Sequence, residues 1–317
     1  MAAANFQCRR TETSCGCGAK FNGVAVAVRR GFGSKLCCPP PRRSILKRIT
    51  GNTGNTGNVQ TVSTMVEFDM DIADAQEAAR RKLAAAYRIV HHLGWTETIY
   101  GHLTLRVPET DNFYINPWGL RYDEVTASNL VEIDIDGNIV GSSNYPVNQA
   151  GFVIHSAVHA GRDDLHCVFH THTTAGMAVA AQQDGLLPIS IMATGYHGRV
   201  GYHDYEGPSL NLGERERLVA SMDGQKVLIL RNHGLLTAGE TVEEAFILMF
   251  RLTRACEIQV AAQAGGAALT IPSLEVCEES ARLTDDFLNG NDGAPAGKLE
   301  FDSYVRLVDA LDPSYKH

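Results

Sequence analysis

The stretch HCVFHTHTTAG, residues 166–176, decides how the chain should fold. Its first half is a short apolar run that predicts a buried strand, and the TTAGMAVAAQQ that follows predicts a helix. Residues two apart on a strand project from the same face, so His170 and His172 should point to one spot. A strand that ends in two converging imidazoles and runs into a helix predicts an α/β fold with a site at the strand end.

Predicted helices and strands alternate on both sides of this stretch. Before it, helical spacing of apolar residues predicts helices over 71–93 and 147–161, and the runs HLTLRVP, NFYINP and LVEIDIDGNIV predict an antiparallel meander between them. After it come a predicted strand (RVGYHDY), a helix (GERERLVASM), a buried strand (KVLILRNHG) and a long helix that begins at the capping box of Thr241 and Glu244. This order predicts a three-layer α/β/α fold with a mixed, largely antiparallel central sheet.

His233 supplies a third imidazole. It ends the buried run KVLILRNHG, where a turn can present its ring at the strand end, and strand ends are where open α/β sheets place their ligand sites. Three imidazoles leave a tetrahedral zinc ion one open position, as in catalytic rather than structural zinc sites. We therefore expect His170, His172 and His233 to hold Zn²⁺, with Fe²⁺ or Mn²⁺ as alternatives. The other interpretation of an H-x-H pair is two surface or hydrogen-bonded histidines.

Composition and charge favour small-molecule chemistry. The 317 residues are 44% apolar, and no run approaches the roughly 18 apolar residues of a membrane-spanning helix. From residue 65 onward, 35 Asp and Glu outnumber 18 Lys and Arg. Nucleic acid and anionic membranes bind clustered positive charge, so neither is an expected partner. The expected partner is a small-molecule substrate.

The chain divides into three parts. Residues 1–64 contain ten Lys and Arg, one acid and the low-complexity run GNTGNTGN, which predicts a disordered leader. This leader is either a transit peptide to a mitochondrion or plastid, or translation upstream of a true start at Met65, in which case the protein is cytoplasmic. Residues 65–270 are the predicted folded domain. Residues 271–317 are a predicted polar tail with one short helix, FDSYVRLVDAL.

Five stretches of the chain resemble the class II aldolase/adducin family. They are YGHLTLRVP, INPWGLRYDEVTASNLVEID, VNQAGFVIHSAVHAGRDDLHCVFHTHTTAG, GYHDYEG and VLILRNHGLLTAGETVEEAF, in the family's order. The resemblance implies His170, His172 and His233 as metal ligands, a metal-dependent carbon–carbon lyase and a homotetramer. The chain is most similar to the adducin-like subgroup, which implies an alternative, a non-enzymatic oligomerisation or binding domain.

One family residue is replaced in this chain. The family's aldolases carry a glutamate, both metal ligand and general base, nineteen residues before the first metal-binding histidine, and that count leads here to Gly151. We expect His155, one helical turn later, to act as the base. The alternatives lie in GYHDYEG, namely Tyr202, His203, Asp204 and Glu206.

The predicted function is a metal-dependent aldolase-like lyase or decarboxylase acting on a small oxygenated carbonyl, hydroxy-acid or keto-acid substrate. Decarboxylation needs the metal but not necessarily a base, so it tolerates the loss of the glutamate better. An iron-dependent oxygenative decarboxylase is a variant of this prediction. His102 and Trp118 replace residues with which the family grips phosphate, so the substrate should be unphosphorylated. A purely structural metal site would close with four protein ligands and is the remaining alternative.

Overall fold

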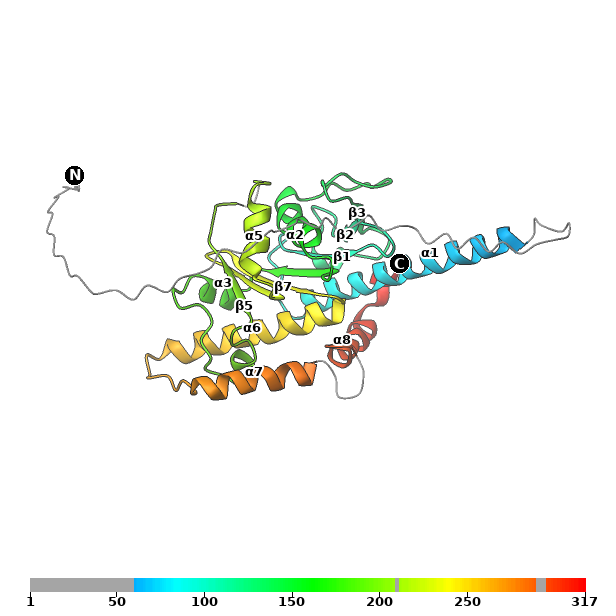
Figure 1. The fold of residues 1–317 in the computed structure, drawn as a ribbon. Coiled ribbons are helices and arrows are strands. Elements are labelled where there is room, and N and C mark those ends of the chain that lie inside the picture. Colours follow the sequence, from blue (N-terminus) through cyan, green and yellow to red (C-terminus); the bar gives the residue numbers. More distant parts are fainter. Residues whose placement is uncertain (1–59, 209–210, 289–294) are drawn as a thin grey trace, which may run out of the picture. The chain divides into compact units, whose positions relative to one another are not determined.

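A seven-stranded sheet lies at the centre of the computed structural model, which describes residues 60–208, 211–288 and 295–317 (Figure 1). In spatial order the strands are β3 (Val131–Ile133), β2 (Phe113–Ile115), β1 (His102–Arg106), β4 (Cys167–Thr171), β7 (Gly234–Gly239), β6 (Val227–Leu230) and β5 (Val200–His203). All neighbouring strands pair antiparallel except β5 and β6, which are parallel. The predicted mixed, largely antiparallel sheet is confirmed.

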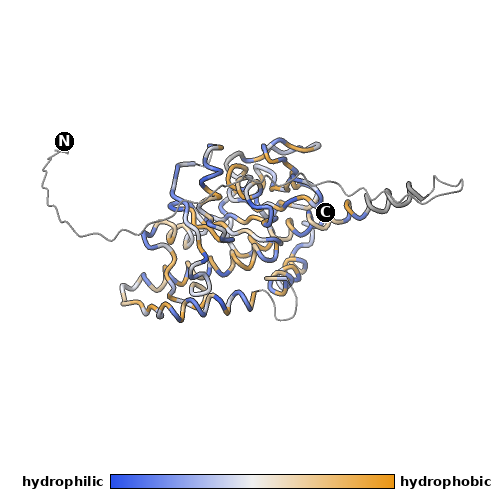
Figure 2. Tube along the Cα trace, viewed as in Figure 1, coloured by the Kyte–Doolittle hydropathy of each residue, from blue (hydrophilic) through white to orange (hydrophobic). Residues whose placement is uncertain are grey.

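Helices cover both faces of the sheet and complete the predicted three layers. On one face pack α1 (Gln60–His92), α3 (Thr174–Ala180) and α6 (Val242–Ala264). On the other lie α2 (Gln149–Gly161) and α5 (Glu214–Met222). The remaining helices, α4 (Ile191–Thr194), α7 (Leu274–Leu288) and α8 (Lys298–Leu311), lie outside α6, away from the sheet (Figure 1). Apolar residues run through the sheet and along α6 (Figure 2).

The central strand β4 shows how the sheet divides the core. Cys167 and Phe169 pack into the apolar cluster beneath α1 and α6, whereas Val168 belongs to the cluster beneath α2 and α5. Side chains alternate between the faces of a strand, so His170 projects to the same side as Val168, towards α2. The strand thus carries its histidine on the face opposite to the larger apolar cluster.

The strand β7, the short helix α4 and the helix α7 were not predicted. The residues after His233 form β7, which pairs with β4 on one side and β6 on the other. Its short sequence, GLLTAG, has glycine at both ends and no polar alternation, so it carries little strand signal. The segment 271–317 holds two helices, α7 and α8, where one short helix was expected. In α7 the small side chains of Cys277 and Ala281, four residues apart, are buried, whereas Leu274, Val276, Leu283 and Phe287 are exposed.

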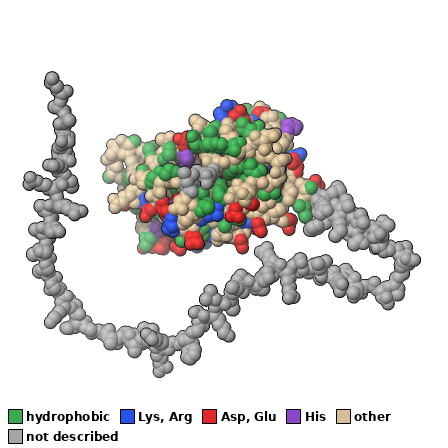
Figure 3. Space-filling model, turned by 90° about the horizontal axis from the view of Figure 1, so that it is seen from above, with side chains coloured by type: hydrophobic (Ala, Val, Ile, Leu, Met, Phe, Trp, Pro, Cys, Tyr) green, Lys and Arg blue, Asp and Glu red, His purple; other side chains and the backbone are tan. Residues whose placement is uncertain are grey.

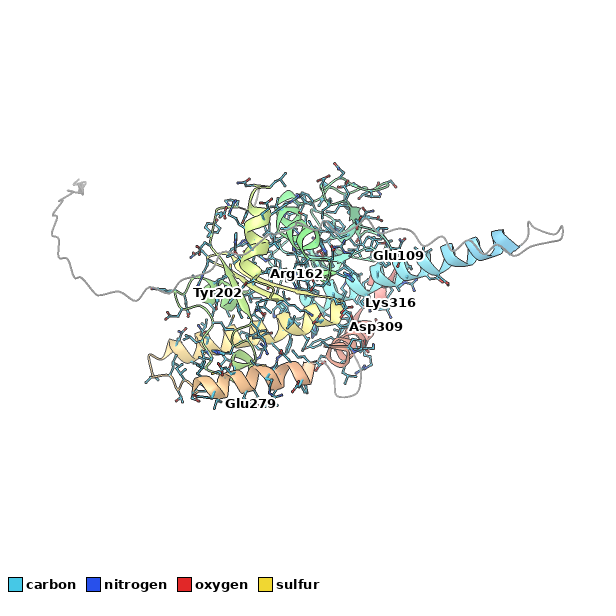
Figure 4. The ribbon with its side chains drawn as sticks, in the orientation of Figure 1. Glu109, Arg162, Tyr202, Glu279, Asp309 and Lys316 are labelled. Atoms are coloured by element: carbon cyan, nitrogen blue, oxygen red, sulfur yellow. The ribbon has the colours of Figure 1, made fainter. Side chains whose placement is uncertain are left out.

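The C-terminal helix belongs to the folded unit. α8 packs against α1 and α6, and the short 3₁₀ helix Pro313–Lys316 follows it. Nη1 of Arg88 in α1 donates a hydrogen bond to the carboxylate of Asp312. Lys316 and Asp309, labelled in Figure 4, form an ion pair of 2.7 Å beside this contact.

The first described helix begins within the predicted leader. α1 starts at Gln60, eleven residues before the helix expected over 71–93, and it includes residues 60–64. Residues 1–59 lie outside the described part of the chain, and most of the predicted leader falls there. In the part that the structure describes, no helix has both the length and the apolarity to cross a bilayer. On the face seen in Figure 3, acidic and basic side chains are interspersed around a largely apolar middle.

Candidate metal centre

The structure brings the three predicted histidines together. His170 is the fourth residue of β4, His172 follows the end of that strand, and His233 lies in the turn between β6 and β7. One ring nitrogen from each of the three lies within 4.8 Å of those of the other two. The ring centroids of His170 lie 4.6 Å from His172 and 4.9 Å from His233. Residues more than sixty positions apart thus meet where the central strand β4 ends and β7 begins.

Hydrogen bonds orient two of the rings. Nδ1 of His170 donates to the backbone carbonyl of Leu235 at 2.9 Å, and Nδ1 of His172 donates to the Glu97 carboxylate at 3.0 Å. Both partners can only accept, so each Nδ1 carries a proton and each Nε2 of a neutral ring presents a lone pair. The two Nε2 atoms are 2.9 Å apart. Two facing lone pairs repel unless a proton or a cation lies between them, so this donor set fits a divalent metal.

Burial keeps the rings of His170 and His233 neutral. His170 is 2% exposed, and burial, followed by the neighbouring His172, lowers the pKa of its ring well below the usual value. Burial also lowers the pKa of His233 to about 4. A metal binds the unprotonated imidazole, so these rings need lose no proton to accept one at neutral pH.

The turn between β6 and β7 depends on two unusual backbone positions. Asn232 has a left-handed φ of 55°, a conformation that asparagine adopts more readily than most residues and that lets the chain reverse before His233. Gly234 packs so closely that a Cβ there would lie 2.6 Å from the carbonyl oxygen of Thr171. Glycine therefore lets the hairpin approach β4, and this approach places His233 beside the other two rings.

A cavity of about 350 Å³ opens beside the histidines. Its wall includes Glu97, which precedes β1, His102 of β1, and Gly151 of α2. Glu97 is the single carboxylate among the described residues that line it. Sequence reasoning did not single out Glu97, which lies in an irregular segment without a motif, and it noted His102 only as a departure from the phosphate-binding pattern.

Comparison with known proteins agrees with this geometry. The family described as Class II Aldolase and Adducin N-terminal domain matches residues 81–260, which include all three histidines. The chain belongs to the class II aldolase/adducin family. The resemblance seen in the sequence is thereby confirmed.

Three relatives show the breadth of the class II aldolase/adducin family around this chain. The crystal structure of an aldolase II superfamily protein from Pseudomonas syringae is 47% identical with a TM-score of 0.72, and the match covers 77% of this chain and 96% of that one. L-fuculose 1-phosphate aldolase from Glaciozyma antarctica PI12 is 27% identical with a TM-score of 0.68, covering 78% and 94%. Alpha-adducin of Rattus norvegicus is 44% identical over 249 residues, which are 74% of this chain and 34% of that protein.

His155, the expected base of this class II aldolase/adducin family member, is buried behind the cavity wall. It is fully buried, and it is not among the residues that line the cavity. Its Nδ1 and the Nε2 of His159 each lie 2.8 Å from the hydroxyl of Thr104. Its ring lies 6.3 Å, centroid to centroid, from that of His170. Burial lowers its pKa well below the usual value. A catalytic role for His155 stays a prediction.

The stretch GYHDYEG, which held the alternative bases, is engaged in other contacts. Glu206 forms an ion pair with Arg217, and Nδ1 of His203 lies 2.9 Å from the Ser221 hydroxyl. The hydroxyl of Tyr202 accepts a hydrogen bond from the backbone of Leu186. Of the described residues in this stretch, Tyr205 and Gly207 line the cavity, and neither was among the proposed bases.

Proposed function

We propose that the chain is a divalent-metal-dependent lyase or decarboxylase that acts on a small, unphosphorylated hydroxy or keto acid. The facing Nε2 atoms of His170 and His172 carry this proposal, because their Nδ1 protons are engaged elsewhere and a cation would relieve the repulsion between them. His233 would complete a set of three nitrogen ligands with an open position. Zinc is the proposed metal, with Fe²⁺ and Mn²⁺ as alternatives.

Decarboxylation suits the residues around the cavity best. A bound divalent cation would supply a Lewis acid that withdraws electron density from a carbonyl oxygen. When a carboxylate sits on the carbon next to that carbonyl, its C–C bond can break so that CO₂ leaves and the electron pair forms an enolate on the carbonyl oxygen. Water then protonates the enolate carbon, so no protein base is required first. Glu97 already accepts a hydrogen bond from His172, and His155 lies behind the wall. The lyase reaction would need a base, and His155 remains the proposed one.

The size of the cavity supports a small substrate. Its volume of about 350 Å³ is at the lower end of the range for ligand pockets. An iron-dependent oxygenative decarboxylation is the variant of this proposal that consumes O₂. Oxygen uptake that accompanies turnover would distinguish it from simple decarboxylation.

A second candidate function is non-enzymatic. Its support is the 44% identity with rat alpha-adducin across most of the folded part of this chain. In this alternative the fold serves for oligomerisation or partner binding. A homotetramer is proposed for either function, and light scattering of the purified protein measures it.

Metal content and turnover together decide between the two candidates. We expect the purified full-length chain to hold about one divalent ion per subunit and to melt at a higher temperature after zinc is added to the metal-free form. His170→Ala should abolish both effects. His166→Ala, which removes a histidine near the other end of β4, is the matched control and should bind metal normally. A screen of 2-oxo and 3-hydroxy acids should then reveal metal-dependent turnover.

Two results would argue against the enzyme. A protein without metal that gains no thermal stability from added zinc, iron or manganese would support the binding domain instead. Stoichiometric metal without turnover of any acid in the screen would contradict the proposed lyase or decarboxylase while leaving the metal site intact.

A further inference from the structure

A glycine and an imidazole pack against one another in the wall of the cavity. Gly151 lies in the first turn of α2, and His102 begins β1. A Cβ built on Gly151 would overlap Cδ2, Nε2 and Cγ of the His102 ring. The backbone of Gly151 is helical without a positive φ, so its conformation does not require glycine. Because glycine is unfavourable inside a helix, the reason for it here is the space that the ring occupies.

The ring of His102 is held in place and cannot yield easily. Its side chain is buried, and its Nδ1 donates to Oδ1 of Asn116 at 3.1 Å. Nδ2 of Asn148 donates to its Nε2, also at 3.1 Å. Burial lowers the pKa of this imidazole to about 4, so the ring is neutral at neutral pH. Two hydrogen bonds and the contact with Gly151 therefore fix a neutral group beside the three histidines.

This arrangement sets the charge of the cavity. Among the described lining residues Glu97 alone is a carboxylate, and it accepts the Nδ1 proton of His172. With a divalent ion on three neutral imidazoles, the cavity would carry a net positive charge. A carboxylate at position 151, as in the aldolases that the chain resembles, would cancel part of that charge, but the His102 ring occupies the place of the first carbon of such a side chain.

We propose that His102 and Gly151 form a matched pair that keeps a protein carboxylate out of the space beside the three histidines, so that the carboxylate of a 2-oxo or 2-hydroxy acid occupies it. His102 is then a residue that determines specificity for anionic substrates. This inference rests on the proposed metal site, and it names the feature by which that site selects an acid.

The first part of the inference, that the His102 ring requires glycine at position 151, is tested on the metal-free full-length chain. Gly151→Ala should lower the melting temperature by about 5 °C or more, a shift that corresponds to a sizeable loss of stability in a protein of this size. In a His102→Ala background the same substitution should leave the melting temperature unchanged or raise it, because alanine favours helices. Gly265→Ala, where a Cβ would meet nothing within 4 Å, is the control. Equal effects of Gly151→Ala in both backgrounds would overturn the matched pair.

The second part of the inference, that the absence of a protein carboxylate lets the site bind an acid, is tested with two double variants and with oxalate as the probe. Wild-type protein loaded with zinc should bind oxalate in calorimetry, and the metal-free form should not. His102→Asn combined with Gly151→Glu should keep zinc but bind oxalate at least tenfold more weakly. His102→Asn combined with Gly151→Gln, which has the same shape without the charge, should stay within about threefold of wild type. Circular dichroism and the zinc content of each variant verify that it is folded and loaded.

The outcomes separate this inference from the proposed function. If the glutamate and glutamine variants bind oxalate equally well, the exclusion of a protein carboxylate is not what selects the acid, and the inference is overturned with the metal site intact. If wild-type protein takes up no zinc, iron or manganese, the proposed function is wrong, and the proposed preference for acids is wrong as well. The melting experiment still decides the steric pair in that case.

Discussion

Glu97 and His172 lie 75 positions apart in the sequence, and the carboxylate of Glu97 accepts a hydrogen bond of 3.0 Å from Nδ1 of His172. Glu97 stands in the short segment between α1 and β1, where it forms an isolated bridge with Tyr100 and where Thr98 has a left-handed φ of 52°. This constrained segment aims the carboxylate at the ring. The contact fixes both the tautomer and the orientation of His172.

Removal of the Glu97 carboxylate should weaken metal binding. We expect Glu97→Ala to lower zinc affinity by roughly 10- to 100-fold, the usual effect of losing a hydrogen-bond partner of a ligating histidine. Glu97→Gln should lose less, because its amide oxygen still accepts the Nδ1 proton. Competition with a chromogenic chelator measures the affinity. Glu77→Ala, on the exposed face of α1, is the control, and an unchanged affinity in Glu97→Ala would contradict the role of this contact.

The left-handed residue before His233 should tolerate glycine but not a β-branched side chain. Asn232→Gly keeps the φ of 55° accessible, whereas Asn232→Val should lower the free energy of unfolding by roughly 1–2 kcal/mol. The valine variant should also bind zinc more weakly, because its strained turn displaces His233. Urea unfolding and the chelator assay measure the two effects. Similar stability of the glycine and valine variants would show that the turn relaxes.

Stability should fall as the pH drops below the usual range of histidine. Burial, then the nearby charges of Arg106 and His166, lower the pKa of His159 to about 3. In the unfolded chain this ring takes up a proton near pH 6.5, so below that pH protonation favours the unfolded state until the folded ring also titrates. His159 alone should cost roughly 3 kcal/mol between pH 7 and pH 4.

His159→Gln tests this pH dependence directly. The variant should show a shallower fall in the free energy of unfolding between pH 6.5 and pH 4 than the wild type, whatever its stability at pH 7. Chemical denaturation of the metal-free protein at several pH values provides the slope. His91→Gln, at an exposed position of α1, serves as the control. Parallel slopes for His159→Gln and the wild type would show that this ring does not contribute.

The C-terminal helix should contribute to global stability. Phe301 of α8 is 2% exposed and packs edge-on against Phe246 of α6, with ring centroids 5.6 Å apart. Phe301→Ala should therefore lower the free energy of unfolding by roughly 3–5 kcal/mol. Leu299→Ala, two residues earlier and 70% exposed, should change it by less than about 0.5 kcal/mol. A small effect of Phe301→Ala would mean that α8 unfolds independently of the sheet.

Local patterns were enough to predict most of the fold. The alternation of apolar segments indicated the helices α1, α2, α3, α5 and α6 and six of the seven described strands. The strand β7 was not predicted, because six residues with two glycines carry little strand signal. The helix α7 was not predicted because charged residues are frequent in its sequence, although its apolar residues recur at helical spacing. The strand β7 is stabilised by its pairing with β4 and β6 rather than by its own composition.

The sequence by itself determined that His170 and His172 share a face, because the geometry of a strand repeats every two residues. It also indicated that His233 follows a buried strand, since that depends on local apolarity. Only the tertiary structure decided that Glu97 orients His172, that the His102 ring fills the space beside Gly151, and that His155 is buried behind the cavity. These contacts join residues far apart in the chain, and no local periodicity encodes them.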